Sequence, residues 1–197
     1  NDIQIYRPFL IRSGQQEGLS FVNSDLTAGI KFSAGGFEAK YGDRMSSVLD
    51  VEYKKPTKLG GSLSASLLGC SGHIEGSVKD KFTFLAGVRF KSNAYLFKTM
   101  DTKGDYKPWF LDAQLLMTYK PIKKLEISLL GNFAVNRYLF VPSDRTAVFG
   151  SLSSTLSRYT VYYTGQEVDK YENYLGALTF KYLADEDNTY KFILSSY

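Results

Sequence analysis

The chain has 197 residues, a formal net charge of +4 and 15% aromatic residues, with 15 tyrosines and 14 phenylalanines. Because Tyr, Phe, Val, Thr and Ile favour strands, this composition predicts an all-β protein with enough chain for a sizeable core. A single cysteine excludes an internal disulfide framework, the scattered lysines and arginines do not predict nucleic-acid binding, and no apolar run reaches the roughly 18 residues of a membrane helix.

The first informative stretch is GGFEAKYGDRMSSV, residues 35–48, which leads into an alternating run at residues 48–53. A phosphate-binding loop needs Gly-x4-Gly-Lys-Ser/Thr, whereas Gly42 is followed by Asp43, whose charge would repel phosphate. A dinucleotide-binding motif needs G-x-G-x-x-G at the start of a helix, and neither that spacing nor a helical period is present. The stretch therefore predicts a glycine-rich connection before a strand, and no nucleotide cofactor.

After residue 60, apolar and polar residues alternate in segments of about ten residues. Alternation with a period of two predicts strands that have one apolar and one polar face. No segment of comparable length shows a helical period. The predicted strands lie within residues 61–69, 81–97, 111–119, 125–135, 173–182 and 189–197.

The connections between these strands are of two kinds. Residues 77–81, 120–124 and 184–188 are short, polar and typical of turns, whereas residues 98–108 and about 141–157 form long connections. Alternate connections of an antiparallel meander lie at the same end of the sheet. We therefore expect tight turns at one end and large loops at the other.

The alternation fits two kinds of protein. A soluble β domain turns its apolar face inward, whereas an outer-membrane barrel turns it towards lipid and keeps polar residues in the lumen. Aromatic residues gather at strand ends, as interfacial girdles require: Tyr95, Phe97, Trp109, Phe110, Tyr119, Tyr138, Phe140 and Tyr182. The membrane barrel is favoured, and the soluble domain stays open.

The membrane alternative makes a definite assignment of faces. Lipid-facing positions are expected to include Phe84, Val88, Leu115, Leu129 and Phe133. The polar face opposite them is expected to include Arg89, Lys91, Asp112, Gln114, Glu126 and Asn132.

The stretch at 35–48 also resembles a known family. It is similar to the end of the plug domain of TonB-dependent outer-membrane receptors, in which G-G-x-x-A-x-Y-G-x-R-x-S-S-V leads through a last plug strand into the barrel. The matching residues are Gly35, Gly36, Ala39, Tyr41, Gly42, Arg44, Ser46, Ser47 and Val48. Asp43 departs from the pattern, since many relatives have glycine there. Residues 101–114, 136–150 and 165–171 resemble early barrel strands and loops of the same family.

This resemblance implies a fold and a domain division. Residues 1–56 would be the C-terminal part of a plug domain, and residues 57–197 the N-terminal strands of an antiparallel transmembrane β-barrel. Receptors of the family have 22 strands, and this chain has room for about seven or eight. We therefore expect a fragment of a larger receptor.

The resemblance also implies a function. The expected protein is not an enzyme; it would take up a nutrient across the outer membrane of a Gram-negative cell. Its partners would be TonB (through a segment outside this chain), an extracellular ligand and outer-membrane lipid, with a surface lipoprotein as a further candidate. Alternatives are a small self-contained outer-membrane barrel acting as anchor or adhesin, and a soluble ligand-binding β domain.

Within the family motif, Gly35, Gly36 and Gly42 are expected to permit tight reversals and close backbone approach. Arg44 is expected to pair with a carboxylate of the barrel wall or of the plug, because a buried guanidinium needs a partner. An ordinary glycine-rich turn with an exposed arginine is the simpler alternative. Tyr41, Ser46 and Ser47 complete the set to which a structural or gating role is assigned.

No catalytic, metal or cofactor site is predicted. Cys70 and His73 are three residues apart, which places them on opposite faces of a strand. Residues 185–188 are acidic but lack the spacing of a calcium loop, so a solvated turn is favoured. Glu167 and Asp169 share a strand face, as paired acids of a glycosidase would, without a second supporting group.

Overall fold

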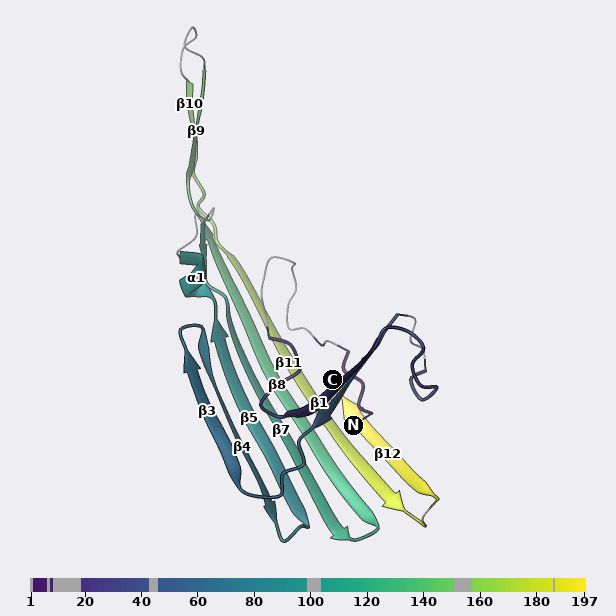
Figure 1. Cartoon of the computed structure of the whole chain (residues 1–197). Coiled ribbons are helices and arrows are strands. Elements are labelled where there is room, and N and C mark those ends of the chain that lie inside the picture. Colours follow the sequence, from purple (N-terminus) through teal and green to yellow (C-terminus); the bar gives the residue numbers. More distant parts are fainter. Residues whose placement is uncertain are drawn as a thin grey trace.

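The computed structural model describes residues 2–6, 8, 19–42, 46–98, 104–150, 157–185 and 187–197. Its main body is one eight-stranded antiparallel sheet with the order β12-β11-β8-β7-β5-β4-β3, and β6 pairs with β8 off this path (Figure 1). The bounds are β3 (Gly60–Ser66), β4 (Gly69–Val78), β5 (Phe82–Ser92), β6 (Gly104–Tyr106), β7 (Trp109–Ile122), β8 (Leu125–Pro142), β11 (Glu167–Leu183) and β12 (Thr189–Ser196). In the described part of the chain, β3 and β12 are the free edges, so the sheet is open.

Two hairpins and one short helix complete the molecule. The N-terminal part of the chain, with β1 (Thr27–Ser33) paired to β2 (Val48–Tyr53), lies across one face of the sheet. The other hairpin, β9 (Arg145–Phe149) with β10 (Ser157–Val161), projects beyond the end of the sheet where α1 (Ala94–Lys98) also lies (Figure 1). None of the described helices is of the length and apolar character needed to cross a membrane.

The strands predicted from alternation are confirmed, as is the antiparallel order. The connections at residues 79–81, 123–124 and 184–188 are short, and all three lie at the end of the sheet opposite the β9–β10 hairpin (Figure 1). The longer connections, after β5 and after β8, lie at the other end, as expected (Figure 1). The two-residue turn Leu67–Leu68 between β3 and β4 also lies at that end, beside Ser92, so the separation of short and long connections is not complete.

Two expected features differ in the structure. Residues 94–98, expected to continue the strand before them, form α1, because β5 ends at Ser92 and the carbonyl of Asn93 accepts the first helical bond from Phe97 N (3.2 Å). Asn is a favoured residue at such a helix start. The connection expected at 141–157 contains paired strands of its own, which alternation over only five residues is too short to reveal.

The pairing registers divide the side chains of the sheet between two faces, because directly opposed residues of neighbouring strands point to the same side. Arg89 pairs with Asp112, and Asp112 with Ala134, so these three share a face. We call this the inner face, since it contacts residues 20–26; its other members include Ser71, His73, Glu75, Gln114, Glu126, Asn132, Asn173 and Thr179.

The opposite side, which we call the outer face, is almost entirely apolar. Its members include Leu63, Ile74, Phe84, Val88, Phe90, Leu115, Met117, Leu129, Phe133, Phe180 and Leu194. The two sets of residues predicted to face opposite ways therefore do so.

The turn between β3 and β4 requires glycine at position 69. The φ angle of Gly69 is +153°, and a Cβ there would lie 2.1 Å from the carbonyl oxygen of Phe90. Alanine would therefore strain the backbone and push against the neighbouring strand.

We predict that Gly69→Ala lowers the free energy of unfolding by about 2 kcal/mol, the usual scale of one strained residue. Gly131→Ala is the matched control, because a Cβ at Gly131 meets nothing within 4 Å. Its effect should stay within about 0.5 kcal/mol, measured by chemical denaturation. Equal effects of the two substitutions would contradict the β3–β4 geometry.

Candidate functional site

A buried ion pair lies at the centre of the inner face. Arg89 of β5 and Asp112 of β7 are directly opposed, and Arg89 Nε and Nη2 each lie 2.8 Å from Asp112 Oδ1. The Asp112 side chain is fully buried and that of Arg89 is 13% exposed. Burial of two charges is tolerable because they are paired and their remaining polar atoms are hydrogen-bonded.

The second oxygen of Asp112 is also occupied. Its Oδ2 accepts hydrogen bonds from Asn132 Nδ2 (2.9 Å) and from Gln114 Nε2 (3.2 Å). Asn132 comes from β8 and Gln114 from β7, so three strands converge on one carboxylate. The carboxylate therefore fixes the positions of both neighbouring donors.

Arg89 and Gln114 bind the backbone of the N-terminal segment. Arg89 Nη2 and Nη1 donate to the carbonyl oxygens of Ser20 and Val22, each at 2.8 Å. Gln114 Nε2 donates to the carbonyl oxygen of the residue between them, Phe21, at 2.5 Å. Three successive carbonyls are thus held by two side chains of the sheet. We call Arg89, Asp112, Gln114 and Asn132 the carbonyl clamp.

Tyr53, at the end of β2, adds a second attachment. Its hydroxyl donates to Gln114 Oε1 (3.1 Å), and its side chain is buried. Burial, with a further contribution from the Asp112 carboxylate, raises the pKa of Tyr53 above its usual value, because an ionised phenolate would be desolvated beside an anion. The phenol is therefore held in its neutral, hydrogen-bond-donating form.

An apolar cluster surrounds the clamp. It joins Phe21, Leu26 and Tyr53 of the N-terminal part with four residues of the sheet: Leu85, Leu130, Leu175 and Ala177. Gly87 makes room for the segment, because a Cβ there would lie 3.0 Å from Leu26 Cδ2 and 3.2 Å from Asn23 Nδ2. Ser71 Oγ also bonds Asp25 Oδ2 (3.1 Å). Residues 20–26 are therefore fixed by polar and apolar contacts together.

Gly35, Gly36, Tyr41 and Gly42 lie in the connection between β1 and β2. Gly35 and Gly36 have φ angles of +109° and +58°, in the region of backbone conformation that favours glycine. A Cβ at Gly35, Gly36 or Gly42 would meet nothing within 4 Å, so the described contacts show no close backbone approach there. Tyr41 donates to Asp50 Oδ2 (2.8 Å).

Ser46 and Ser47 are exposed. Arg44, to which a paired carboxylate was assigned, and its neighbour Asp43 lie outside the described residues. The structural or gating role of the whole motif stays a prediction.

Cys70 and His73, the other candidate pair from the sequence, are separated by the sheet. Cys70 is exposed on the outer face and His73 lies on the inner face, as predicted from their spacing. His73 Nδ1 lies 2.8 Å from Ser62 Oγ. No group of three His, Cys, Asp or Glu residues within the described ranges could hold a metal ion.

The two acidic stretches singled out in the sequence lie in a turn and on one face of a strand, as their spacing predicts. The turn at 184–188 is closed by a hydrogen bond from Asn188 N to Asp185 Oδ1 (2.9 Å). Glu167 and Asp169 share the inner face of β11, opposite Phe140 and Tyr138.

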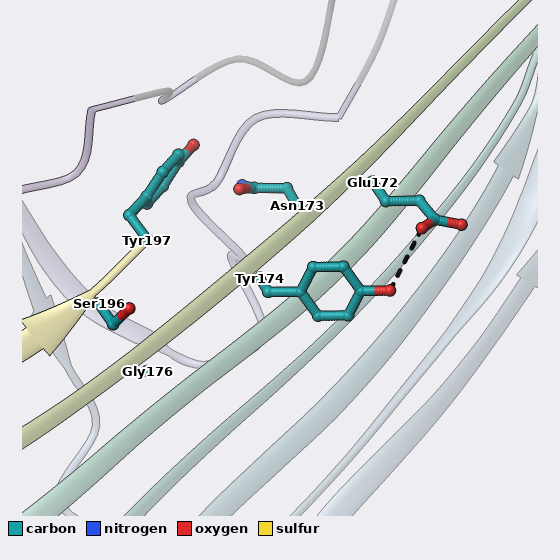
Figure 2. Close-up of a pocket in the computed structure, with 6 residues that line it drawn as sticks. All are labelled: Glu172, Asn173, Tyr174, Gly176, Ser196 and Tyr197. Carbon is teal, nitrogen blue, oxygen red and sulfur yellow. Dashed lines mark hydrogen bonds between the residues drawn. The ribbon is translucent and has the colours of Figure 1, made fainter.

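A cavity of about 440 Å³ lies beside the end of β12 (Figure 2). Its lining residues are Glu172, Asn173, Tyr174, Gly176, Ser196 and Tyr197. Tyr174 donates to Glu172 Oε2 (3.3 Å) on the outer side, whereas Asn173 belongs to the inner face. Because its lining comes from both faces of one strand, the cavity is a notch at the sheet edge. The carbonyl clamp is the better-built site.

Comparison of the chain with models of protein families, with curated proteins and with solved structures finds no match.

Only part of the carbonyl clamp can be predicted from the sequence. Alternation places all four of its residues on the polar face, as predicted, but it does not reveal their contact with residues 20–22. The one available signal was opposite charge at Arg89 and Asp112, on polar faces of strands expected to be neighbours.

We predict that Arg89→Ala destabilises the protein by about 3–5 kcal/mol, because it leaves the Asp112 carboxylate buried and unpaired. Arg89→Lys should recover only part of the lost stability, since an ammonium group lacks the planar, forked donors with which the guanidinium bonds Asp112 and two carbonyls. Arg158→Ala, at an exposed arginine, is the control. Chemical denaturation measures all three, and an Arg89→Ala effect as small as the control would contradict the buried pair.

The pKa of Tyr53 gives a pH prediction. Above pH ~10 an unfolded tyrosine loses its proton while folded Tyr53 keeps it, so stability is full below that pH and falls as pH rises. Wild type should lose up to ~1.4 kcal/mol more per pH unit than Tyr53→Phe between pH 10 and 11.5. Tyr159→Phe, at an exposed tyrosine, should follow wild type. Identical slopes for wild type and Tyr53→Phe would contradict the prediction.

Proposed function

We propose that the chain is part of a TonB-dependent outer-membrane receptor, with residues 57–197 as its first wall strands and residues 1–56 as the end of its plug. The observation that carries this proposal is the polarity of the two sheet faces. The face that the N-terminal segment covers is mainly polar, with an apolar cluster that includes Leu85, Leu130 and Leu175, and the almost entirely apolar face is the one left open. A soluble β domain has the opposite arrangement.

The exposure of the outer face supports a lipid environment. Leu63, Val88 and Phe192 are 87%, 50% and 62% exposed, and they belong to an apolar surface that crosses the whole sheet. Soluble monomers rarely expose a contiguous apolar patch of more than a few hundred Å². At ~25 cal/mol per Å², removing such a surface from water is strongly favourable. Lipid chains would cover it without requiring any specific partner.

Aromatic residues border this apolar surface at both ends. Trp109 packs against Phe90 at the loop end of the outer face (ring centroids 6.3 Å apart), and Tyr119 lies at the turn end. Ten residues separate Trp109 from Tyr119 on β7, about 33 Å of strand. A strand tilted by about 40° would then cross ~25 Å, which matches the apolar band of outer-membrane barrels.

The inner face supports a plug–wall relation. Its serines, asparagines and charges suit a polar lumen, and its clamp holds residues 20–22 by their backbone. A small barrel acting as an anchor would give this segment no evident role. In the proposed receptor, the N-terminal segment would help to close the lumen.

In the mechanism that the family resemblance implies, ligand binds from outside and TonB rearranges the plug to open a path. The residues of this chain would contribute wall strands, loops at the β9–β10 end, and the clamp that holds the plug segment. TonB would act through a segment outside this chain. The protein would lie in the outer membrane of a Gram-negative cell and would catalyse no reaction.

We predict that nitroxide labels at Val88 and Leu129 of the lipid-reconstituted protein relax faster with oxygen, which is concentrated in lipid. Labels at Glu126 and Thr118, on the inner face of the same sheet, should respond more to a water-soluble nickel complex. Electron paramagnetic resonance measures both. Outer-face labels that favour the nickel complex would contradict the membrane proposal.

A further inference from the structure

Residues 20–22 are held in the way that a binding site holds a peptide. Each of their three carbonyls accepts a hydrogen bond from Arg89 or Gln114. Among the described residues, β5, β7 and β8 form their backbone pairs with one another. None of these pairs includes residues 20–22. The backbone hydrogen bonds between these strands therefore do not depend on the segment.

The middle residue of the bound stretch fills an apolar site. The Phe21 side chain is 5% exposed and belongs to the cluster that includes Leu130 and Leu175 of the wall. Ser20 and Val22 are only partly buried. Recognition thus combines backbone carbonyls, which any peptide offers, with one buried aromatic ring.

The charges of the site further restrict the class of ligand that fits it. Asp112 neutralises Arg89, and Gln114 and Asn132 are uncharged, so the donors face the segment without net charge. A phosphate or carboxylate would find no excess positive charge there. The neutral oxygens of an extended peptide backbone satisfy the donors in full.

We propose that the carbonyl clamp is a peptide-binding site, and that it accepts an extended peptide with a central aromatic residue in place of residues 20–22. This inference does not rest on the proposed transport function, because a sheet in any environment would carry the same donors. Within that function it would make peptides a class of ligand for the wall.

The bound segment competes with any added peptide. A tethered segment acts at an effective concentration of order mM, so wild type should bind a free peptide weakly. Phe21→Ala removes the buried ring from the competitor while it leaves the clamp intact. The variant should therefore bind peptide at least tenfold more tightly than wild type.

The test uses the whole chain in detergent micelles and a fluorescein-labelled peptide, Leu-Ser-Phe-Val-Asn-Ser, the sequence of residues 19–24. Fluorescence anisotropy should show saturable binding to the Phe21→Ala variant above the background of empty micelles. The peptide Leu-Ser-Ala-Val-Asn-Ser should bind the same variant at least tenfold more weakly. This comparison needs no change in the wall.

A second variant tests the donors. Arg89→Gln with Asp112→Asn, added to Phe21→Ala, removes the ion pair without leaving a lone charge, and should weaken binding at least tenfold. Circular dichroism confirms its fold. Absence of saturable binding to the Phe21→Ala variant, or equal binding of the two peptides, would overturn the proposal. Neither result bears on the membrane proposal, which the nitroxide labels test.

Discussion

The arrangement of this molecule depends on one buried ion pair, Arg89 with Asp112. The pair exists only in the observed β5–β7 register, because a shift of one residue would turn one of the two side chains to the outer face. Once formed, it leaves the remaining Arg89 donors and Gln114 directed at the carbonyls of the N-terminal segment. The register of the sheet thus determines both the buried ion pair and the attachment of the N-terminal segment.

The same register decides the character of the outer face. Since side chains alternate along every strand, placing the polar set against the N-terminal segment places the apolar set on the opposite side. The sheet therefore cannot bury its apolar face with the described residues. A chain with this pattern needs an apolar medium or a partner for that face, and lipid is the medium that the proposed function supplies.

Much of this could be predicted from local pattern. Alternation predicts most of the long strands and their two faces, because a period of two depends only on neighbouring residues. It does not identify the ten-residue strand β4. It does not predict α1, where Asn93 starts a helix, or the short β9–β10 hairpin. The contact of Arg89 with Val22 spans 67 residues, and tertiary packing alone brings such positions together. The plug–wall division and the role assigned to Arg44 stay predictions.

The contact between Arg89 and the segment is open to direct measurement by solid-state NMR of the lipid-reconstituted protein. Ser20-Phe21 is the only Ser-Phe pair in the sequence, so ¹³C-carbonyl serine with ¹⁵N-phenylalanine selects the Ser20 carbonyl. Its oxygen lies 2.8 Å from Arg89 Nη2, which places the carbonyl carbon at most about 4 Å from that nitrogen. The account predicts strong dephasing by ¹⁵N-labelled guanidinium, lost in Arg89→Lys. A signal without dephasing in the wild type would contradict it.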